Sequence, residues 1–499
     1  MKYIVLILAM AFCSVSCNDW LDVRPDTEQK DKDQFSSVDG FFDALTGCYM
    51  TLADKDAYGE RLTLSNIESL ANLWSMTSST TRYADQELSK HDYKKDYARE
   101  ALAAMYDKLF HAIVQANMII KYADERGDVF VDEAMRKVVQ GEAYAIRAYC
   151  QLDVLRLFGQ MPVNAKTTKQ LPYSFTTSIY EMPAYYDFDA YVKLLKKDIA
   201  KAQELLKDND PVFECTFSEL NGSADVADNH LFFRQSRLNY WAVKALEARM
   251  LLYIGDKPGA YAAAKALIDA KDADGDPVMK MSGVSDINNG YMAYPNECLF
   301  YISKHDLLTK ASFLMGGSKG QFSSSNLGLT KTMFDELYAD LPANYLTSHN
   351  RYKNVWGSCE TPDHIAYRTV MKYWWDDTKN DRPGSSSSDQ LYRKLIPMLR
   401  MSEVYLIAME TAELAEANQL FEDYMEQHSV ASVLLKSFTS PEEVSAFVLN
   451  EYRREFYAEG QMFYTYKRRG ETSIKWYAEA AGEDTYVLPL PETEYNPNL

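Results

Sequence analysis

The chain lacks any long apolar run after its first residues. No segment beyond Phe12 approaches the roughly 20 apolar residues that a helix needs to span a membrane. A surplus of basic residues is also missing, because 53 Lys and Arg face 72 Asp and Glu, which gives a formal net charge of −19. Nucleic acid, whose phosphates attract basic surfaces, is therefore excluded as a partner. Direct electrostatic docking on anionic lipid is excluded for the same reason.

Cysteine is scarce and forms no metal-binding motif. The seven cysteines are widely spaced, and neither CxxC nor HExxH occurs in the sequence. These spacings suggest no disulfide framework and argue against structural zinc. With 499 residues, 47% of them apolar, the chain can bury a large core without such staples. We expect no cofactor and no catalytic site.

The first 16 residues have the form of a secretory signal. Lys2 precedes an apolar run at 3–12 that is too short to cross a bilayer, and small residues follow it. Cys17 directly follows Ser16, as the lipid acceptor does in a bacterial lipoprotein signal. We therefore expect residues 1–16 to be removed and Cys17 to be acylated. Ser14 stands where such signals usually have Leu, which leaves cleavage by a general signal peptidase as the alternative.

Helical periodicity dominates the region after the signal. Apolar residues recur at steps of three and four in 102–119 and again in 134–155, with a short polar segment between the two runs. This pattern predicts an antiparallel helix pair, in which Gly141 lets a neighbouring helix approach closely. A second pair is predicted at 236–270 and a third at 400–435. Their length is close to the roughly 34 residues of a tetratricopeptide (TPR) repeat.

The composition changes between these helical blocks. Residues 271–394 are rich in Gly, Ser, Asn, Tyr and Trp, with turn clusters and short β-like runs at 298–302 and 365–375. We expect a mainly α fold in which TPR-like hairpins at 35–270 and 395–499 form a scaffold. We expect the insert at 271–394 to be loop-rich, partly β, without helices, and to face the ligand. Residues 17–34 are then a linker to a single domain at 35–499.

Five segments of the chain carry motifs of one protein family. The segment at 451–470 reads EYRREFYAEGQMFYTYKRRG, which resembles the Glu-x-Arg-Arg-Glu-x-x-x-Glu-Gly helix pair of SusD/RagB proteins. Four further segments resemble the same family in the same order: 139–163, which ends in Phe-Gly-x-x-Pro, 236–256, 400–410 and 486–499. Gln461, Met462, Thr465 and Arg469 depart from the family pattern. We interpret the charged residues of this segment as a structural network of intrahelical ion pairs, each worth a few tenths of a kcal/mol at a surface.

The resemblance implies a function and a location. SusD/RagB proteins are surface lipoprotein components of glycan uptake in Bacteroidetes. The resemblance implies a non-enzymatic glycan-binding protein at the extracellular face of the outer membrane, anchored through lipid. Its partner would be a SusC-like TonB-dependent transporter. The alternatives are a RagB-like protein that captures oligopeptides and, from another class, a secreted helical glycoside hydrolase.

Aromatic residues are the main candidates for ligand contacts. They form 13% of the chain, and 36 residues are Tyr, whose ring and hydroxyl suit a half-wet surface. A flat ring can stack on the apolar CH face of a sugar while neighbouring polar groups bind its hydroxyls. For each candidate in a loop-like region, core packing is the alternative to ligand contact. The candidates are Trp74, Tyr83, Tyr291, Tyr294, Trp356, Trp374 and Trp375, whereas we place Trp241, on a helix stripe, in the core.

One acidic run invites comparison with a calcium loop. Asp272, Asp274 and Asp276 occupy the first, third and fifth places of an EF-hand-like loop. The glycine comes at the fourth place instead of the sixth, and Gly283 stands at the twelfth place instead of Glu. We expect a solvated turn here, with calcium binding as the alternative.

The lipid anchor can be tested at Cys17. Stable attachment needs more than one acyl chain or a second signal, and the several chains of a lipoprotein meet this requirement. We expect Cys17→Ala to release the protein from the membrane fraction, measured by fractionation and immunoblotting. If the variant still sediments with membranes in high salt and without a transporter, the lipid anchor is wrong.

Overall fold

The structure is a computed structural model that describes most of the chain. The described residues are 32–75, 81–166, 169–178, 180–316, 322–323, 325–361, 366–373 and 392–495. The signal peptide, the lipidation candidate Cys17, and the ligand candidates Trp374 and Trp375 lie outside these residues. Predictions about them stay predictions.

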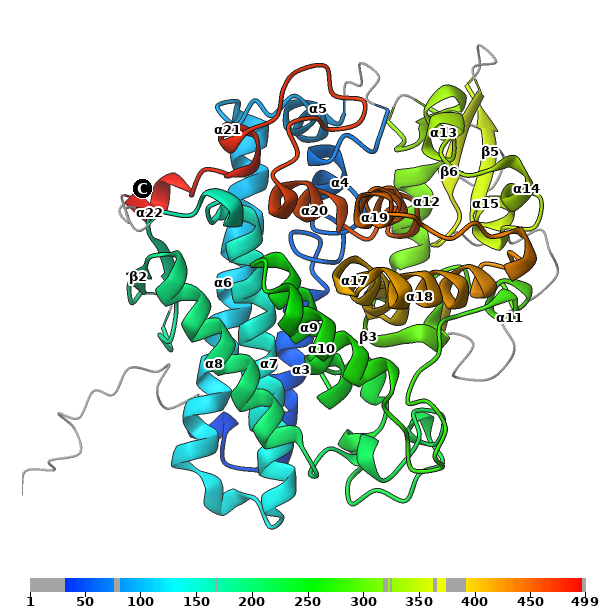
Figure 1. The fold of residues 1–499 in the computed structure, drawn as a ribbon. Coiled ribbons are helices and arrows are strands. Elements are labelled where there is room, and N and C mark those ends of the chain that lie inside the picture. Colours follow the sequence, from blue (N-terminus) through cyan, green and yellow to red (C-terminus); the bar gives the residue numbers. More distant parts are fainter. Residues whose placement is uncertain are drawn as a thin grey trace, which may run out of the picture.

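Four long helices form the N-terminal half of the scaffold (Figure 1). The predicted antiparallel pair is confirmed as α6 (Asp96–Glu125) and α7 (Glu133–Phe158), with α3 (Val38–Leu52) against both and α8 (Phe188–Leu206) on the far side of α7. A Cβ atom on Gly141 would lie 2.8 Å from Leu206, so the glycine does permit a close approach, in this case by α8. A short hairpin, β1 (Leu171–Tyr173) with β2 (Ala184–Tyr186), precedes α8.

The other predicted hairpins are also present. They are α9 (Tyr240–Tyr253) with α10 (Lys257–Ile268), and α17 (Met401–Thr411) with α18 (Leu414–Gln427). Asp256 caps α10 by accepting the N–H of Gly259, and Pro258 stands in the first turn of that helix. Because α10 packs on α17, hairpins that are distant in sequence are neighbours in space. The helices α19 (Pro441–Glu455) and α20 (Met462–Arg469) follow, and α21 (Glu483–Tyr486) and α22 (Glu492–Tyr495) lie near the C-terminus.

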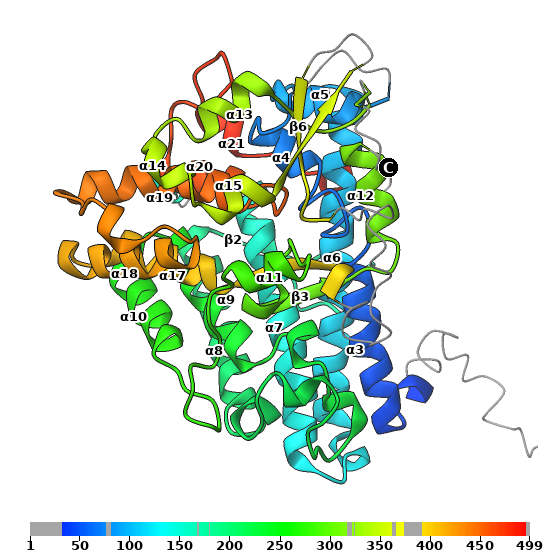
Figure 2. The same ribbon diagram turned by 90° about the vertical axis from the view of Figure 1, so that its right-hand side faces the viewer.

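The insert at 271–394 contains both strands and helices (Figure 2). Strand β3 (Cys298–Ser303) pairs antiparallel with β7 (Leu395–Arg400), and β4 (Leu329–Thr330), β6 (Ala366–Val370) and β5 (Trp356–Glu360) form a second sheet in that order. The expectation that helix is absent from this region is wrong. Short helices occur at α11 (Val284–Asn288), α12 (Leu307–Met315), α13 (Lys331–Leu337), α14 (Ala343–Leu346) and α15 (Asn350–Asn354).

These helices escaped detection because most of them span fewer than two turns. Such a length leaves no room for a repeating apolar stripe. Tertiary packing and local caps stabilise them instead. In α13, for example, Phe334 and Leu337 are buried, and the Thr330 hydroxyl accepts the N–H of Met333.

One large apolar core contains residues from Phe35 to Leu488, including Tyr294 and Phe300 of the insert, and a small separate cluster consists of Phe322, Cys359 and Tyr367. The extent of the large core supports the single domain at 35–499, which remains our proposal. None of the helices in the described part of the chain is both long and apolar enough to cross a membrane.

A buried network of charges joins the insert to the scaffold. Arg400, at the end of β7, contacts three carboxylates: Glu297 at 2.5 Å, Glu455 at 2.6 Å and Glu459 at 2.8 Å. Glu459 also pairs with Lys372, which follows β6. All five side chains are buried. These contacts are long-range, so the expectation of surface ion pairs within one helix is wrong for Glu455 and Glu459.

Further basic residues extend this network. Arg351 lies 3.5 Å from Glu455, His428 lies 3.0 Å from the same carboxylate, and Arg454 pairs with Glu451 at 2.7 Å within α19. Burial raises the pKa of the Glu455 carboxyl, but Arg351 and other cations outweigh burial and hold this pKa well below its usual range. Glu455 is therefore ionised at neutral pH.

The network predicts a large effect for the loss of Arg400. Arg400→Met leaves three buried carboxylates without their shared cation, so we expect the free energy of unfolding to fall by about 3–5 kcal/mol. Urea denaturation followed by circular dichroism measures this change. Arg99→Met is the control, because Arg99 forms half-exposed pairs worth about 0–1 kcal/mol. Equal midpoints for the two variants would contradict the assignment.

Candidate ligand-binding site

Two exposed tyrosines stack on each other at one end of the scaffold. Tyr83 opens α5 (Tyr83–Ser89) and Tyr97 lies in the first turn of α6, with ring centroids 4.8 Å apart and planes 17° from parallel. Tyr83 is 42% exposed and Tyr97 is 47% exposed. Glu87 of α5 accepts the N–H of Ala98 at 2.8 Å, which ties the two helices together. The stack is therefore held by the backbone as well as by ring contact.

The tyrosines line a cleft of about 310 Å³, which we call the tyrosine cleft. Its remaining lining residues are Lys55, Glu60, Arg61, Asn66, Thr81, Arg82, Ala84 and Asp85. Aromatic rings and hydrogen-bonding side chains thus meet in one concave place, as they do in sites for small polar ligands.

Hydrogen bonds fix most of the polar wall of the tyrosine cleft. Asn66, on α4 (Asn66–Leu70), donates to Asp85 at 2.8 Å and accepts from Arg61 at 2.6 Å. Arg82 pairs with Asp85 at 2.9 Å and donates to the Ser325 carbonyl at 2.6 Å. Because these side chains hold one another, the cleft exists before a ligand arrives.

The side chains of Glu60 and Lys55 are polar groups of the cleft that the hydrogen bonds described above do not hold in place. No hydrogen bond or ion pair within the described residues engages the side chain of Glu60 or of Lys55. Burial raises the pKa of the Glu60 carboxyl, although Arg82 and other nearby cations lower it. A carboxylate beside an aromatic stack can accept a hydrogen bond from a ligand hydroxyl, and an ammonium can donate one to a ligand hydroxyl.

Two of the aromatic residues that were predicted to contact a ligand are buried. Trp74 is 2% exposed, and its indole N–H donates to the Leu64 carbonyl at 3.1 Å while its ring packs edge-on against Tyr457. Tyr294 is fully buried, with the Arg351 guanidinium 4.0 Å from its ring centroid. The expectation that these two rings form exposed platforms is wrong, because the segments that carry them pack into the core.

The other candidates have mixed positions. Tyr83 is on the surface as expected. Trp356 is partly buried, donates to the Tyr338 hydroxyl at 2.9 Å and packs against Tyr457, so it belongs to the edge of the core. Tyr291 is also partly buried and lies away from the tyrosine cleft, against Tyr392.

Trp241 was expected in the core, but it is only partly buried. It is partly exposed at the start of α9, and its ring packs against Phe213, with centroids 5.5 Å apart.

Tyr97 is not among the aromatic residues that the sequence predicts to contact a ligand. Its signal is an aromatic residue among charged neighbours, Asp96, Arg99 and Glu100, and therefore outside the apolar stripe of its helix. An aromatic ring on the polar side of an amphipathic helix has no core to fill. The pairing with Tyr83 could be recognised only once the loop at 90–95 had placed the two helices side by side.

A second, larger cavity of about 890 Å³ lies between the loop at 216–221, the segment at 268–286 and α18. Its walls are acidic, with Asp272, Asp274, Asp276, Asp286, Asp423 and Glu426 among the lining residues. The calcium candidate forms a tight turn here, in which the Asp272 carboxylate accepts the N–H groups of Asp274 and Asp276. No three carboxylates of this cavity converge on one point in the described residues, so the geometry favours the solvated turn.

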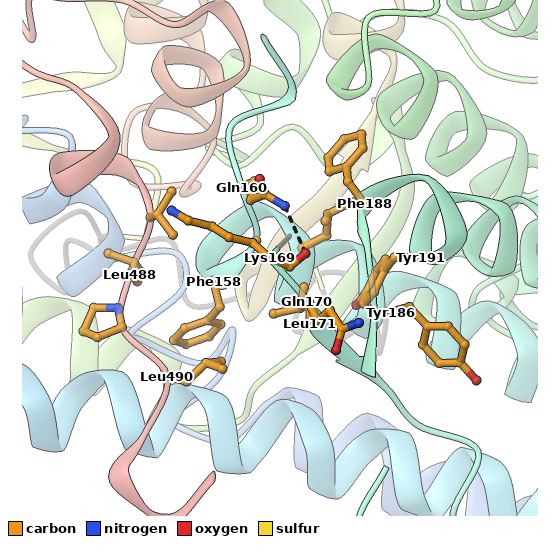
Figure 3. Close-up of a pocket in the computed structure, with 14 residues that line it drawn as sticks. Phe158, Gln160, Lys169, Gln170, Leu171, Tyr186, Phe188, Tyr191, Leu488 and Leu490 are labelled. Carbon is orange, nitrogen blue, oxygen red and sulfur yellow. Dashed lines mark hydrogen bonds between the residues drawn. The ribbon is translucent and has the colours of Figure 1, made fainter. Parts of the chain in front are cut away.

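A third cavity, of about 280 Å³, lies beside the C-terminal segment (Figure 3). Side chains from the end of α7, the β1–β2 hairpin and residues 487–490 face it, and Phe158, Leu171, Phe188, Leu488 and Leu490 make it mostly apolar. The Gln160 amide is already bonded to the Lys169 carbonyl, and Lys169 pairs with Glu483. Few polar groups remain there for a hydroxyl-rich ligand.

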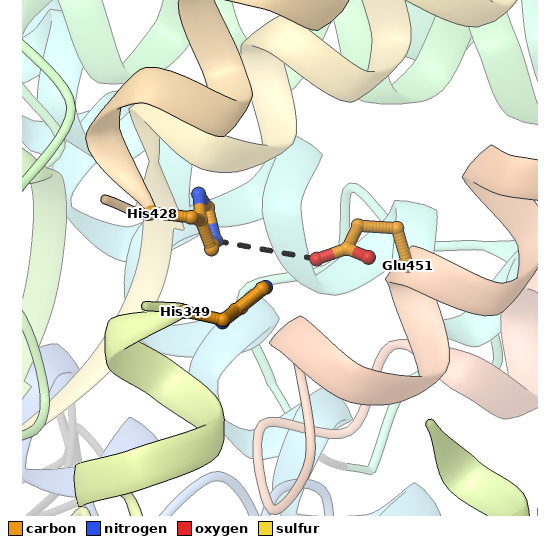
Figure 4. A group of neighbouring side chains, drawn as sticks. All are labelled: His349, His428 and Glu451. Atoms are coloured by element: carbon orange, nitrogen blue, oxygen red, sulfur yellow. Dashed lines mark ion pairs between the residues drawn. The ribbon is translucent and has the colours of Figure 1, made fainter. Parts of the chain in front are cut away.

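Three buried side chains have the composition of a metal site (Figure 4). His349 caps the start of α15, His428 ends α18 and Glu451 lies on α19, with one ligand-type atom of each within 4.8 Å of the others. This is the only group of its kind in the part of the chain that the structure describes. Glu451 is already paired twice with Arg454.

Hydrogen bonds also engage Nδ1 of His349 and both nitrogens of His428. Nδ1 of His349 accepts the N–H of Tyr352 at 3.3 Å, so Nε2 carries the proton, and burial lowers the pKa of this residue well below its ordinary value. Both nitrogens of His428 are engaged, Nδ1 with the Tyr424 carbonyl at 2.8 Å and Nε2 with the Glu455 carboxylate at 3.0 Å. Neither ring offers a free lone pair to a metal. We therefore assign the three residues to the charge network.

Comparisons with known proteins agree on one family. Residues 19–218 match a family model described as starch-binding associating with outer membrane, and residues 288–497 match a model of the SusD family. No curated protein sequence matches the chain.

Solved structures cover nearly the whole chain. A SusD superfamily protein from Bacteroides thetaiotaomicron has 19% sequence identity and a TM-score of 0.66, over 93% of this chain and 98% of that chain. Surface glycan-binding protein A from Bacteroides uniformis has 16% identity and a TM-score of 0.67, over 92% and 98%. A SusD-like carbohydrate binding protein from Bacteroides vulgatus has 13% identity and a TM-score of 0.66, over 93% and 97%. The chain belongs to the SusD/RagB family and has its mainly helical fold.

Proposed function

We propose that the protein binds oligosaccharides in the tyrosine cleft and catalyses no reaction. The observation that carries this proposal is the exposed stack of Tyr83 and Tyr97 beside fixed polar side chains. A sugar ring needs both an apolar surface for its CH face and partners for its hydroxyls. Of the three cavities above, this one brings exposed aromatic faces and unengaged polar groups together. The family model's description and two of the related structures, which are named for binding glycan or carbohydrate, support the same ligand class.

The location and partner are also part of the proposal. An acylated Cys17 would hold the protein at the extracellular face of the outer membrane, and a SusC-like TonB-dependent transporter would receive the bound oligosaccharide. The lipoprotein-like start of the sequence and the family membership support this arrangement. The net charge of −19 leaves lipid as the means of attachment, because an acidic body does not bind anionic headgroups.

Oligopeptide capture is the second candidate, and one observation favours it. The acidic cavity is large enough for several side chains, and its carboxylates are spread along the walls instead of converging. Such walls suit an extended ligand with several positive groups more than a single ion. A peptide rich in Lys or Arg has this chemistry.

Hydrolysis has weak support in the described residues. The spacing Gly-x-Ser-x-Gly occurs at 316–320, of which only Gly316 is among the described residues, and in the sequence it follows helix α12, whereas a nucleophile elbow follows a strand. The buried carboxylates of the charge network are paired with cations and lie away from the tyrosine cleft.

The tyrosine cleft can be tested by substituting its rings. We expect Tyr97→Ala or Tyr83→Ala to weaken oligosaccharide binding by about 1–3 kcal/mol, because each removes an exposed aromatic anchor, with little change in melting temperature. Isothermal titration against a panel of oligosaccharides that begins with maltoheptaose, and against a panel of basic peptides, measures binding. Mass spectrometry of the mixtures detects any cleavage.

Two matched controls sharpen this test. Tyr180→Ala removes a tyrosine that is 90% exposed outside the cleft and should leave affinity unchanged. Trp74→Ala truncates a core ring and should lower stability by about 3–5 kcal/mol. Undiminished affinity in both cleft variants would place the site elsewhere. Binding of peptides alone would replace the ligand class, and cleaved ligand would end the non-enzymatic proposal.

A further inference from the structure

The tyrosine cleft rests on the turn between α19 and α20 through the short helix α4. On one side, Asn66 and Ser69 of α4 both donate to Asp85 of the cleft, at 2.8 and 2.9 Å. On the other, the Glu68 carboxyl of α4 accepts the N–H of Gly460 in the turn at 2.6 Å. A single turn of helix therefore links a lining residue of the cleft to the C-terminal helix pair (Figure 1).

The contact between this segment and the turn is tight. Gly460 has a φ of +75°, and a Cβ atom there would lie 2.2 Å from the Leu62 carbonyl oxygen. Nearby, Trp74 packs edge-on against Tyr457 of the same turn, with ring centroids 5.0 Å apart. The two backbones thus meet directly at Gly460, which leaves no room for a side chain at this position.

The Glu68 carboxyl occupies a position that disfavours charge. It is 1% exposed, and its Oε2 atom has no hydrogen-bond partner among the described residues. The charged groups that face it are Glu459 of the turn, an anion, and Lys372 after β6, which already binds Glu459 and two carbonyls. Burial raises the pKa of Glu68 to about 8, against the lowering effect of N–H groups in the turn and of Lys372.

We infer that Glu68 is a positioning residue for the tyrosine cleft: its neutral form holds α4 against the turn at 456–461, and its ionisation loosens this contact and the Asn66–Asp85 wall with it. An ionised carboxylate without a partner for Oε2 draws in water, and α4 must move to admit it. This role rests on the proposed function where it is tested by ligand binding. The test by hydrogen exchange does not depend on that function.

The sign of the pH effect follows from proton linkage. Between its ordinary pKa of 4.5 and about 8, Glu68 keeps its proton in the folded state and loses it in the unfolded state. Its contribution to stability therefore falls as pH rises from 4.5 to 8. Above pH 8 the folded protein carries the buried charge, which is where α4 should loosen.

Hydrogen exchange of residues 57–73, compared at pH 7 and pH 9 after correction for the intrinsic exchange rates, tests the contact directly. The wild type should exchange faster at pH 9. Glu68→Gln keeps the acceptor for Gly460 and cannot ionise, so its exchange should show no such increase. Glu410→Gln, which alters a buried carboxyl paired with Arg468, should respond to pH as the wild type does. An identical pH response in wild type and Glu68→Gln, or no response in the wild type, overturns the inference.

Binding gives a second measurement. If only the neutral form is competent, the affinity of the wild type for the oligosaccharide selected by the panel falls about tenfold from pH 7 to pH 9, while Glu68→Gln keeps its affinity. Equal losses in both proteins would show that other groups cause the effect and would refute the positioning role. If no oligosaccharide binds at any pH, the proposed function fails, and the exchange experiment still decides the role of Glu68.

Discussion

Buried charge is the constraint on which much of this fold depends. Ions removed from water destabilise a protein unless each finds a partner in good geometry. Arg400 satisfies this condition for Glu297, Glu455 and Glu459, which belong to the insert, to α19 and to the turn after α19. Because these pairs are directional, they fix how the insert lies on the helical scaffold. Apolar burial alone tolerates more than one packing of the same helices.

The same network determines where the tyrosine cleft lies. Glu455 ends α19 just before the turn at 456–461, and Glu459 lies within that turn. The turn supports the segment at 62–74 through Gly460 and Tyr457. The cleft is thus built next to a part of the core that contains several buried ion pairs. A binding wall of mutually hydrogen-bonded side chains loses little conformational entropy when a ligand arrives, which suits capture of a weakly held sugar.

Binding fits the exposed chemistry of this protein better than catalysis does. The carboxylates with lowered pKa values in the interior, such as Glu455 and Glu410, lie against arginines and have no access to a ligand. The aromatic stack and the unengaged Glu60 and Lys55 instead lie at the surface. The acidic second cavity offers a different chemistry at a separate place. We therefore expect substitutions in the tyrosine cleft to weaken binding of a sugar, and substitutions in the acidic cavity to weaken binding of a basic peptide.

The sequence by itself determined the helical scaffold, because 3.6-residue periodicity persists over enough turns in 102–119 and 134–155 to exclude other structures. It also determined the family, through motifs such as Glu451 to Gly460. Tertiary structure decided which aromatics reach solvent: Trp74 and Tyr294 sit in segments that read as loops yet pack into the core, and Tyr97 gains its role only beside Tyr83. It also decided that Glu455 and Glu459 pair with Arg400 and not within their own segment. Local sequence records the character of each side chain, whereas exposure and long-range pairing depend on which segments fold against it.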